Sequence, residues 1–253
     1  MIEKKNITYF LGTHQPGWLA KTRVPLFVSY TRLNHYKILP KSRSKWALDS
    51  GAFSELHKHG KWTVTPSEYA DGVRRLNERV GQLQWASIQD WLCTPAVIQR
   101  TGLSIKIHQK KTIESLCRLR SLAPEIDWLP VLQGWSTKSY FDHMKMYRAQ
   151  GFELEHEALV GVGSVAVRQD SAILPEVLGA LHQEGFRIHA FGLSITGLMR
   201  VHQFIESSDS MVWSFTARRR QIKHKQCNEH HDICNNCLRY ALAWRSDLLS
   251  QLN

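Results

Sequence analysis

The sequence predicts an α/β protein with a (β/α)8 barrel of the TIM type and a C-terminal zinc-binding subdomain. Strand-like and helix-like segments alternate along most of the chain, which is the order that a parallel barrel requires. Three strand-like runs end in Asp49, Asp90 and Gln133. A polar group there costs free energy unless it is paired or used. Parallel barrels carry their reactive side chains at such strand ends.

Eight short apolar runs are predicted to form the strands. They are Ile7–Gly12, Leu26–Ser29, Trp46–Leu48, Trp85–Ile88, Leu129–Leu132, Leu159–Val162, Ile188–Phe191 and Ser208–Phe215. Apart from its strand, the range 14–39 is irregular and predicts no clear element.

The helix with the clearest boundaries is Pro66–Val80. Pro66 suits the first turn of a helix, and Gly81 suits the position after the last turn. The other predicted helices are Gln109–Leu122, Thr137–Gln150, Ala172–Glu184, Thr196–Glu206 and Leu238–Leu249. A doubly wound open sheet has the same alternation and is the alternative fold.

Composition favours a globular protein with a polyanionic partner. The hydrophobic fraction is 43%, the net charge is +11 and the pI is near 9.6. No run approaches the roughly 18 apolar residues of a membrane span, and the first ten residues lack a signal-peptide core, so we expect a cytoplasmic protein. The densest basic stretches are 218–225 and 37–45. Excess positive charge favours nucleic acid, although a merely basic soluble surface is the alternative.

Three cysteines near the C-terminus predict a structural zinc site. Cys227, Cys234 and Cys237 fall within eleven residues, with His230 and His231 between them. Thiolates with one imidazole suit tetrahedral zinc and leave no open position. His231 is the preferred fourth ligand; His230 and His224 are the alternatives, and a chance cluster of reduced thiols is the other interpretation. We therefore expect a barrel over 1–217, with a zinc-binding segment and helix over 218–253 packed on it.

Asp49 lies in the segment LDSGAFSEL, where Gly51 allows a sharp turn close to a ligand. Phe53 is suited to stacking on a flat ring. Asp90 is suited to accepting hydrogen bonds from the N–H groups of a purine, provided that it is ionised, so affinity is expected to fall at low pH. A turn with Asp49 as its cap, and an Asp90 paired inside the core, are the structural alternatives.

Gln133 and Gly134 offer a donor and an acceptor for an amide edge. The loop 161–167, GVGSVAV, lacks a phosphate-binding pattern but brings backbone N–H groups near a ligand. Phe191 and Gly192 end a strand, where Phe191 is expected to face Phe53. Structural hydrogen bonding and simple barrel packing are the alternatives for these segments.

Asp209 and Asp49 together form a pair of acids suited to glycosidic chemistry. In such a pair one carboxylate attacks the anomeric carbon and the other manages protons. A lone Asp beside serines is more often a turn former.

Ten collinear segments resemble the tRNA-guanine transglycosylase superfamily, and within it the DpdA family of 7-deazaguanine DNA transglycosylases of phages and bacterial modification clusters. The segments are LGTH (11–14), PLFVS (25–29), WALDSGAFSEL (46–56), WASIQDWLC (85–93), GLSIKIHQKKTI (102–113), PVLQGW (130–135), GVGSVAVRQ (161–169), HAFGLSITGL (189–198), SSDSMVWS (207–214) and CNNCLRYALAWR (234–245).

The resemblance implies a zinc-bearing barrel that exchanges guanine in DNA for a preQ0-like or preQ1-like base through a covalent glycosyl-aspartate. It implies Asp209 as nucleophile and Asp49 as general acid and base. It implies base recognition by Asp90, Gln133 and the Gly163 backbone, between Phe53 and Phe191, with Ser50, Gly134 and Gly192 also at the base-binding site. DNA and the free base are the expected partners, a homodimer or partner subunit is left open, and a phage-encoded copy would act in the host cytoplasm.

Departures from the tRNA-acting enzymes favour the DNA branch. The chain has DSGAF where they carry a second glycine, and SDSM where they carry Asp-Cys followed by Pro-Thr-Arg. Its zinc segment is Cys-x6-Cys-x2-Cys. The alternatives are the same chemistry on tRNA, a non-catalytic zinc-stabilised nucleic-acid-binding barrel, and a barrel glycoside hydrolase, which the basic charge and the zinc tail disfavour.

Overall fold

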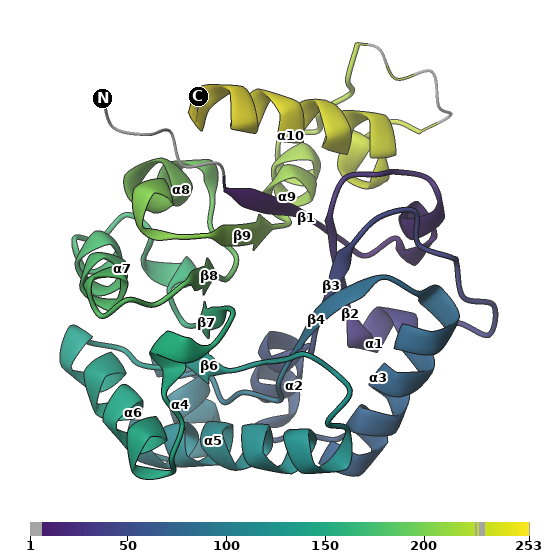
Figure 1. The fold of residues 1–253 in the computed structure, drawn as a ribbon. Coiled ribbons are helices and arrows are strands. Elements are labelled where there is room, and N and C mark those ends of the chain that lie inside the picture. The colour runs from purple at the N-terminus through teal and green to yellow at the C-terminus, as the bar shows by residue number, and fades with distance from the viewer. Residues whose placement is uncertain (1–6, 226, 228–230, 253) are drawn as a thin grey trace.

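The computed structural model describes residues 7–225, 227 and 231–252. Its strands are β1 (Thr8–Thr13), β2 (Leu26–Ser29), β3 (Trp46–Asp49), β4 (Leu83–Ser87), β5 (Trp128–Leu129), β6 (Val131–Leu132), β7 (Val160–Val162), β8 (Ile188–Ala190) and β9 (Ser207–Ser210). They form one parallel sheet of order β5-β4-β3-β2-β1-β9-β8-β7-β6. The predicted α/β barrel is confirmed, as a nearly closed barrel (Figure 1).

The two edge strands of this order are halves of one stretch, 128–132. Pro130 separates them because proline has no N–H for the strand ladder. Its carbonyl nevertheless accepts a hydrogen bond from Gly161 N–H at 2.8 Å. Eight strand positions therefore make up the barrel wall, and the alternative of an open sheet is excluded.

Helices surround the strands on the outside (Figure 1). The α-helices are α1 (Tyr30–Leu33), α2 (Ala52–His59), α3 (Pro66–Val80), α4 (Pro95–Thr101), α5 (Ile105–Leu122), α6 (Thr137–Ala149), α7 (Ile173–Gln183), α8 (Ile195–Val201), α9 (Val212–Arg219) and α10 (Leu238–Leu252). The 3-10 turns are η1 (Pro16–Ala20), η2 (Leu154–His156), η3 (Ala166–Arg168), η4 (His202–Phe204) and η5 (Cys234–Asn236). None of the described helices is long and apolar enough to cross a membrane.

Local signals set the bounds of α3, which match the prediction. Thr65 and Glu68 form a reciprocal capping box, and Pro66 occupies the first helical position. Gly81, with φ of 73°, follows the last turn. These contacts satisfy backbone groups that no neighbouring turn can reach.

The predicted strand Ser208–Phe215 is wrong in its second half. β9 ends at Ser210, and the chain then forms α9. The reason is the spacing of Trp213 and Ala217, which lie four residues apart and bury one face of a helix. The short helices α2 and α4 were not predicted, and the predicted helix Thr196–Glu206 ends at Val201, before η4.

Alternation along the strands divides the core. Phe10, Phe27, Ala47, Trp85 and Leu129 form a cluster separate from the main core. Their strand neighbours belong to the larger cluster that packs against the helices. Because successive side chains on a strand point to opposite faces, the first set fills the barrel interior.

The C-terminal segment contacts the first strand. The rings of Tyr9 and Trp244 lie 6.0 Å apart, and Arg245 Nε donates to the Tyr9 carbonyl at 3.1 Å. Figure 1 shows α10 beside β1 and α9. The division of the chain at residue 217 stays a prediction.

Candidate active site

Eight of the predicted site residues line one cavity of about 480 Å³ at the carboxyl ends of the strands. They are Asp49, Phe53, Asp90, Gln133, Gly163, Phe191, Gly192 and Asp209. A larger cavity of about 710 Å³ lies at the opposite end of the barrel and contains none of them. The carboxyl end is where parallel barrels hold their chemistry.

Strand register places the two candidate catalytic acids on the same side of the sheet. Asp209 pairs with Phe10 of β1, which points into the barrel. Asp49 pairs with Ser29 and lies two residues after the inward Ala47. Both carboxyl groups therefore face inward at the mouth of the barrel.

Asp49 is held by the turn that follows β3. Gly51 N–H donates to Asp49 Oδ1 at 3.1 Å, and Gly51 has φ of 88°, a conformation that favours glycine. Burial raises the pKa of Asp49 to about 6, the Gly51 hydrogen bond lowers it, and the charge of Asp209 raises it. Asp209 lines the same cavity as Asp49, so the two acids share one opening.

Asp209 is buried and fixed on one side. Gly192 N–H donates to its Oδ1 at 3.0 Å, so the predicted Gly192 contacts the nucleophile candidate. His189 Nε2 lies 3.4 Å from the same oxygen, a distance longer than a good hydrogen bond. Oδ2 is therefore the oxygen with which Asp209 would reach a ligand.

His189 lies beside the candidate nucleophile Asp209, and the sequence interpretation did not single it out. Its side chain is fully buried, and its Nδ1 lies 2.8 Å from Ser207 Oγ on the neighbouring strand. The rings of Trp85 and Phe191 lie 4.8 and 4.7 Å from its ring. Alternation in β8 was the available signal, because residues 189 and 191 must share a face.

Asp90 and Gln133 belong to one hydrogen-bonded chain. Gln133 Nε2 donates to Asp90 Oδ2, and Gln133 Oε1 accepts from Ser164 Oγ at 2.7 Å. Ser164 in turn accepts from Cys93 N–H at 2.9 Å. Ser164 was not predicted, and its φ of 61° is uncommon for a residue other than glycine. These bonds fix which end of the Gln133 amide faces Asp90.

Burial raises the pKa of Asp90 to about 7, while the Gln133 hydrogen bond lowers it and the charge of Asp49 raises it. Asp90 is therefore partly protonated near pH 7, and the expectation that base affinity falls at low pH stays a prediction. The physical reason is burial, which no cation of the described residues offsets at this carboxyl. A ligand that donates N–H groups would supply the missing stabilisation.

Two predicted glycines are required by close packing, and a third predicted residue, Ser50, lies outside the cavity. Gly163 N–H donates to the Leu132 carbonyl at 3.0 Å, and a side chain at residue 163 would clash with Gln133. Gly134 lies outside the cavity, where a side chain would come within 2.8 Å of the Tyr140 ring. Ser50 is buried and also lies outside the cavity.

Phe53 and Phe191 differ in their surroundings. Phe53 is 59% exposed on α2 and packs against His57, with ring centroids 4.2 Å apart. Phe191 sits deeper, against Phe27 and His189. Phe53 lines the cavity from α2 and Phe191 from the loop after β8, and their role as the two faces of a base slot stays a prediction.

Two basic side chains lie at the mouth, and Arg32 is the one that stays charged at neutral pH. Arg32 and His14 line the cavity, and His14 Nε2 lies 2.9 Å from Asn236 Oδ1. Burial lowers the pKa of His14, the Asn236 hydrogen bond raises it, and the charges of Arg32 and Arg218 lower it further.

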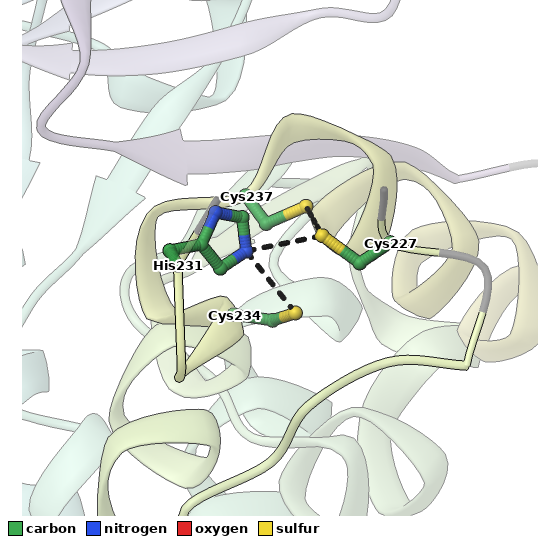
Figure 2. Close-up of side chains that lie close together, drawn as sticks. All are labelled: Cys227, His231, Cys234 and Cys237. Atoms are coloured by element: carbon green, nitrogen blue, oxygen red, sulfur yellow. Dashed lines mark hydrogen bonds between the residues drawn. The ribbon is translucent and has the colours of Figure 1, made fainter. Parts of the chain in front are cut away.

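The four predicted metal ligands lie together (Figure 2). Ligand atoms of Cys227, His231, Cys234 and Cys237 are all within 4.8 Å of one another. His231 Nε2 is 3.1 Å from Cys227 Sγ and 3.4 Å from Cys234 Sγ. Tetrahedral zinc with such ligands has ligand–ligand edges of about 3.5–3.8 Å, so the cluster fits a zinc ion. The alternative ligand His230 lies outside the described residues, and His224 is not in the cluster.

The cysteine-rich segment is connected to the cavity through α9. Ser214 Oγ donates to the Asn235 carbonyl at 2.7 Å, and Asn236 reaches His14 at the rim. Cys234 N–H donates to the Ile222 carbonyl just after α9. The predicted metal centre therefore supports one wall of the candidate site.

The family model DpdA, described as DeoxyPurine in DNA protein A, matches residues 5–253. The match covers the barrel and the cysteine-rich segment together. Comparison with curated proteins finds no match to this chain.

Proposed function

The chain belongs to the DpdA family, a DNA-modification family of the tRNA-guanine transglycosylase-like group, and from this premise we propose that it exchanges guanine in DNA for a 7-deazaguanine base. The observation that carries the proposal is the presence of Asp49 and Asp209 in one cavity at the mouth of the barrel. Paired carboxylates suit substitution at an anomeric carbon. The basic net charge of +11 suits a DNA partner.

In the first half-reaction, Asp209 Oδ2 attacks C1′ of the target nucleotide. The bond from C1′ to N9 breaks, and the leaving guanine takes the proton carried by Asp49. The product is a glycosyl-aspartate, and the DNA backbone stays intact. Covalent catalysis divides one difficult displacement into two easier ones.

In the second half-reaction, N9 of the incoming 7-deazaguanine attacks C1′ and displaces Asp209. Asp49, now a carboxylate, accepts the N9 proton. A pKa of about 6 suits this residue to give and take a proton near neutral pH. The same side chain thus serves as acid and then as base.

His189 acts on Asp209 as a positioning residue. A carboxylate oxygen facing Nε2 favours the tautomer with its hydrogen on Nε2, so that Nδ1 accepts from Ser207 Oγ. The His189 Nε2–H and the Gly192 N–H together hold Asp209 Oδ1, and they thereby orient Oδ2 toward the substrate. Substrate binding would shorten the 3.4 Å contact.

Asp90 and Gln133 read the base. Guanine and its 7-deaza analogues share the same Watson–Crick edge, so one set of contacts serves the leaving and the entering base. Asp90 accepts ring and amino N–H groups, while Gln133, held by Ser164, faces the carbonyl edge. Phe53 and Phe191 cover the two faces of the ring.

The cluster of Cys227, His231, Cys234 and Cys237 would hold a structural zinc ion that fixes the C-terminal segment against α9. Four protein ligands close the coordination shell. We therefore assign the ion no part in base exchange.

The test is incorporation of labelled 7-deazaguanine, and of labelled guanine, into duplex DNA and into tRNA. Wild-type protein should label the DNA. Asp209→Asn should abolish labelling and the denaturation-resistant protein–DNA adduct, yet this variant should bind DNA normally. The control is Asp142→Asn, which changes an acid on α6 outside the cavity and should behave as wild type. Labelling of tRNA alone, or full exchange by the Asp209→Asn variant, would contradict the proposal.

A further inference from the structure

A base within a duplex cannot reach a cavity at the mouth of a barrel. Enzymes that act on such a base extrude it, which costs a few kcal/mol of unstacking and unpairing. Many DNA-bending proteins offset this cost with an apolar side chain inserted into the stack. The rim of the cavity should therefore present an apolar side chain that the fold itself does not use.

Phe215 fits this requirement. It lines the cavity and is 66% exposed. Two other exposed apolar residues, Phe53 and Val167, line the same cavity. Scattered exposed apolar residues are ordinary, but several at one opening mark an interaction site.

Tertiary contacts fix the helix that carries Phe215. α9 follows β9 directly, so the helix begins three residues after Asp209. Trp213 is fully buried, and its Nε1 donates to the Gly12 carbonyl at 2.9 Å. Ser214 bonds to the cysteine-rich segment. These anchors lie on the buried face, and Phe215 points from the opposite side into the opening.

Arginines accompany Phe215 on the exposed face of α9. Arg218 and Arg219 follow it by three and four residues, which places them on the same side of a helix. Both are exposed, and no acidic side chain in the described part of the chain pairs with either. Arg32 adds a further cation at the same mouth. An aromatic ring beside arginines that pair with no described acid complements bases flanked by phosphates.

We propose that Phe215 enters the DNA stack and fills the space left by the extruded guanine, while Arg218 and Arg219 contact the neighbouring phosphates. The inference rests on the proposed function, because it takes duplex DNA as the substrate. Phe53 and Phe215 then have separate tasks: Phe53 covers the extruded base, and Phe215 supports the bases that remain stacked.

The test compares two DNAs that differ only at the target. In one the guanine is paired, and in the other it lies opposite an abasic site and is already unpaired. Phe215→Ala should slow exchange on the paired DNA by about tenfold, the scale of one lost base–aromatic stack, and leave the unpaired DNA unaffected. Phe215→Trp should retain exchange on both. Met199→Ala, an exposed apolar residue on α8 outside the cavity, is the matched control and should match wild type.

An equal loss of exchange rate on both DNAs, or no loss on the paired DNA, would contradict the insertion of Phe215 into the stack. A second measurement tests the insertion of Phe215 separately from the proposed function. It follows the fluorescence of 2-aminopurine placed at guanine positions of a duplex, because this fluorescence rises when the base unstacks. If wild-type protein exchanges no base but raises the fluorescence, and Phe215→Ala does not raise it, the insertion of Phe215 is still supported. Absence of a rise with wild type overturns it.

Discussion

Asp49 and Asp90 are carboxyl groups whose ionisation is coupled. Burial is the largest cause of both raised pKa values, about 6 and about 7, and each acid is also affected by a neighbouring one. Asp209 raises the pKa of Asp49, and Asp49 raises the pKa of Asp90. Near neutral pH Asp90 is therefore partly protonated, and a purine that donates N–H groups to it must displace that proton.

The affinity for free 7-deazaguanine should fall as pH decreases from 8 to 6. Asp90 has a pKa of about 7 and accepts N–H groups only when ionised, so about a tenth of it is competent at pH 6. Equilibrium titration of the base across this range measures the effect. Asp90→Asn should bind weakly at every pH and lose the dependence, whereas Asp142→Asn should keep it. A flat wild-type affinity between pH 6 and 8 would contradict this assignment.

Removal of the His189 ring nitrogens should lower kcat by about tenfold or more. KM for DNA should stay nearly unchanged, because only the orientation of the Asp209 carboxylate changes. Single-turnover formation of the protein–DNA adduct measures this step. His189→Phe should be the slowest variant, and His189→Gln, which still offers an N–H, should recover part of the rate.

The neighbouring serines separate positioning from packing. Ser207→Ala removes the partner of His189 Nδ1 and should slow adduct formation. Ser208→Ala removes a buried hydroxyl that donates to the Ala190 carbonyl instead, and should not. Equal effects of the two substitutions would reduce His189 to a packing residue.

At the scale of elements, α9 joins the parts of the site. It starts beside the end of β9 and carries Phe215 at the cavity rim. Trp213 binds it to the barrel, and Ser214 binds it to η5. The helix is short, so its position depends on these tertiary contacts more than on its own propensity.

Loss of the zinc ligands should loosen α9. Cys234→Ser, or treatment with a chelator, should release bound zinc and lower the Tm by about 5 °C or more, since closed cysteine–histidine sites contribute folding free energy. Thermal unfolding and the zinc content of the purified protein measure the two effects. Cys117→Ser, on the exposed side of α5, is the control and should change neither. A protein that purifies without zinc and melts at the same temperature after Cys234→Ser would exclude a metal centre.

At the scale of the whole molecule, the two ends of the barrel differ. The amino end of the strands opens to a cavity of about 710 Å³ in which Arg120 and Glu157 form an ion pair. The carboxyl end combines buried acids, exposed apolar residues and the cation Arg32. The carboxyl end is therefore the end at which we propose that base exchange takes place.

The sequence by itself determined the features that depend on near neighbours along the chain. Alternating strand and helix signals predicted the barrel, and the Pro66 and Gly81 signals predicted the bounds of α3. Cysteine spacing predicted a cluster that the structure brings together. Such features are local because hydrogen bonds within one turn or one short loop produce them.

Tertiary structure alone decided which polar groups meet. His189 and Ser207 are 18 residues apart, and Ser164 and Gln133 are 31 apart. No periodicity in the sequence encodes these pairs, because strand register and barrel closure set them. Burial of Trp213 against Gly12 likewise made 212–219 a helix where a short apolar run had predicted a strand. A local pattern fixes what each segment is able to become, and packing between distant segments selects among those conformations.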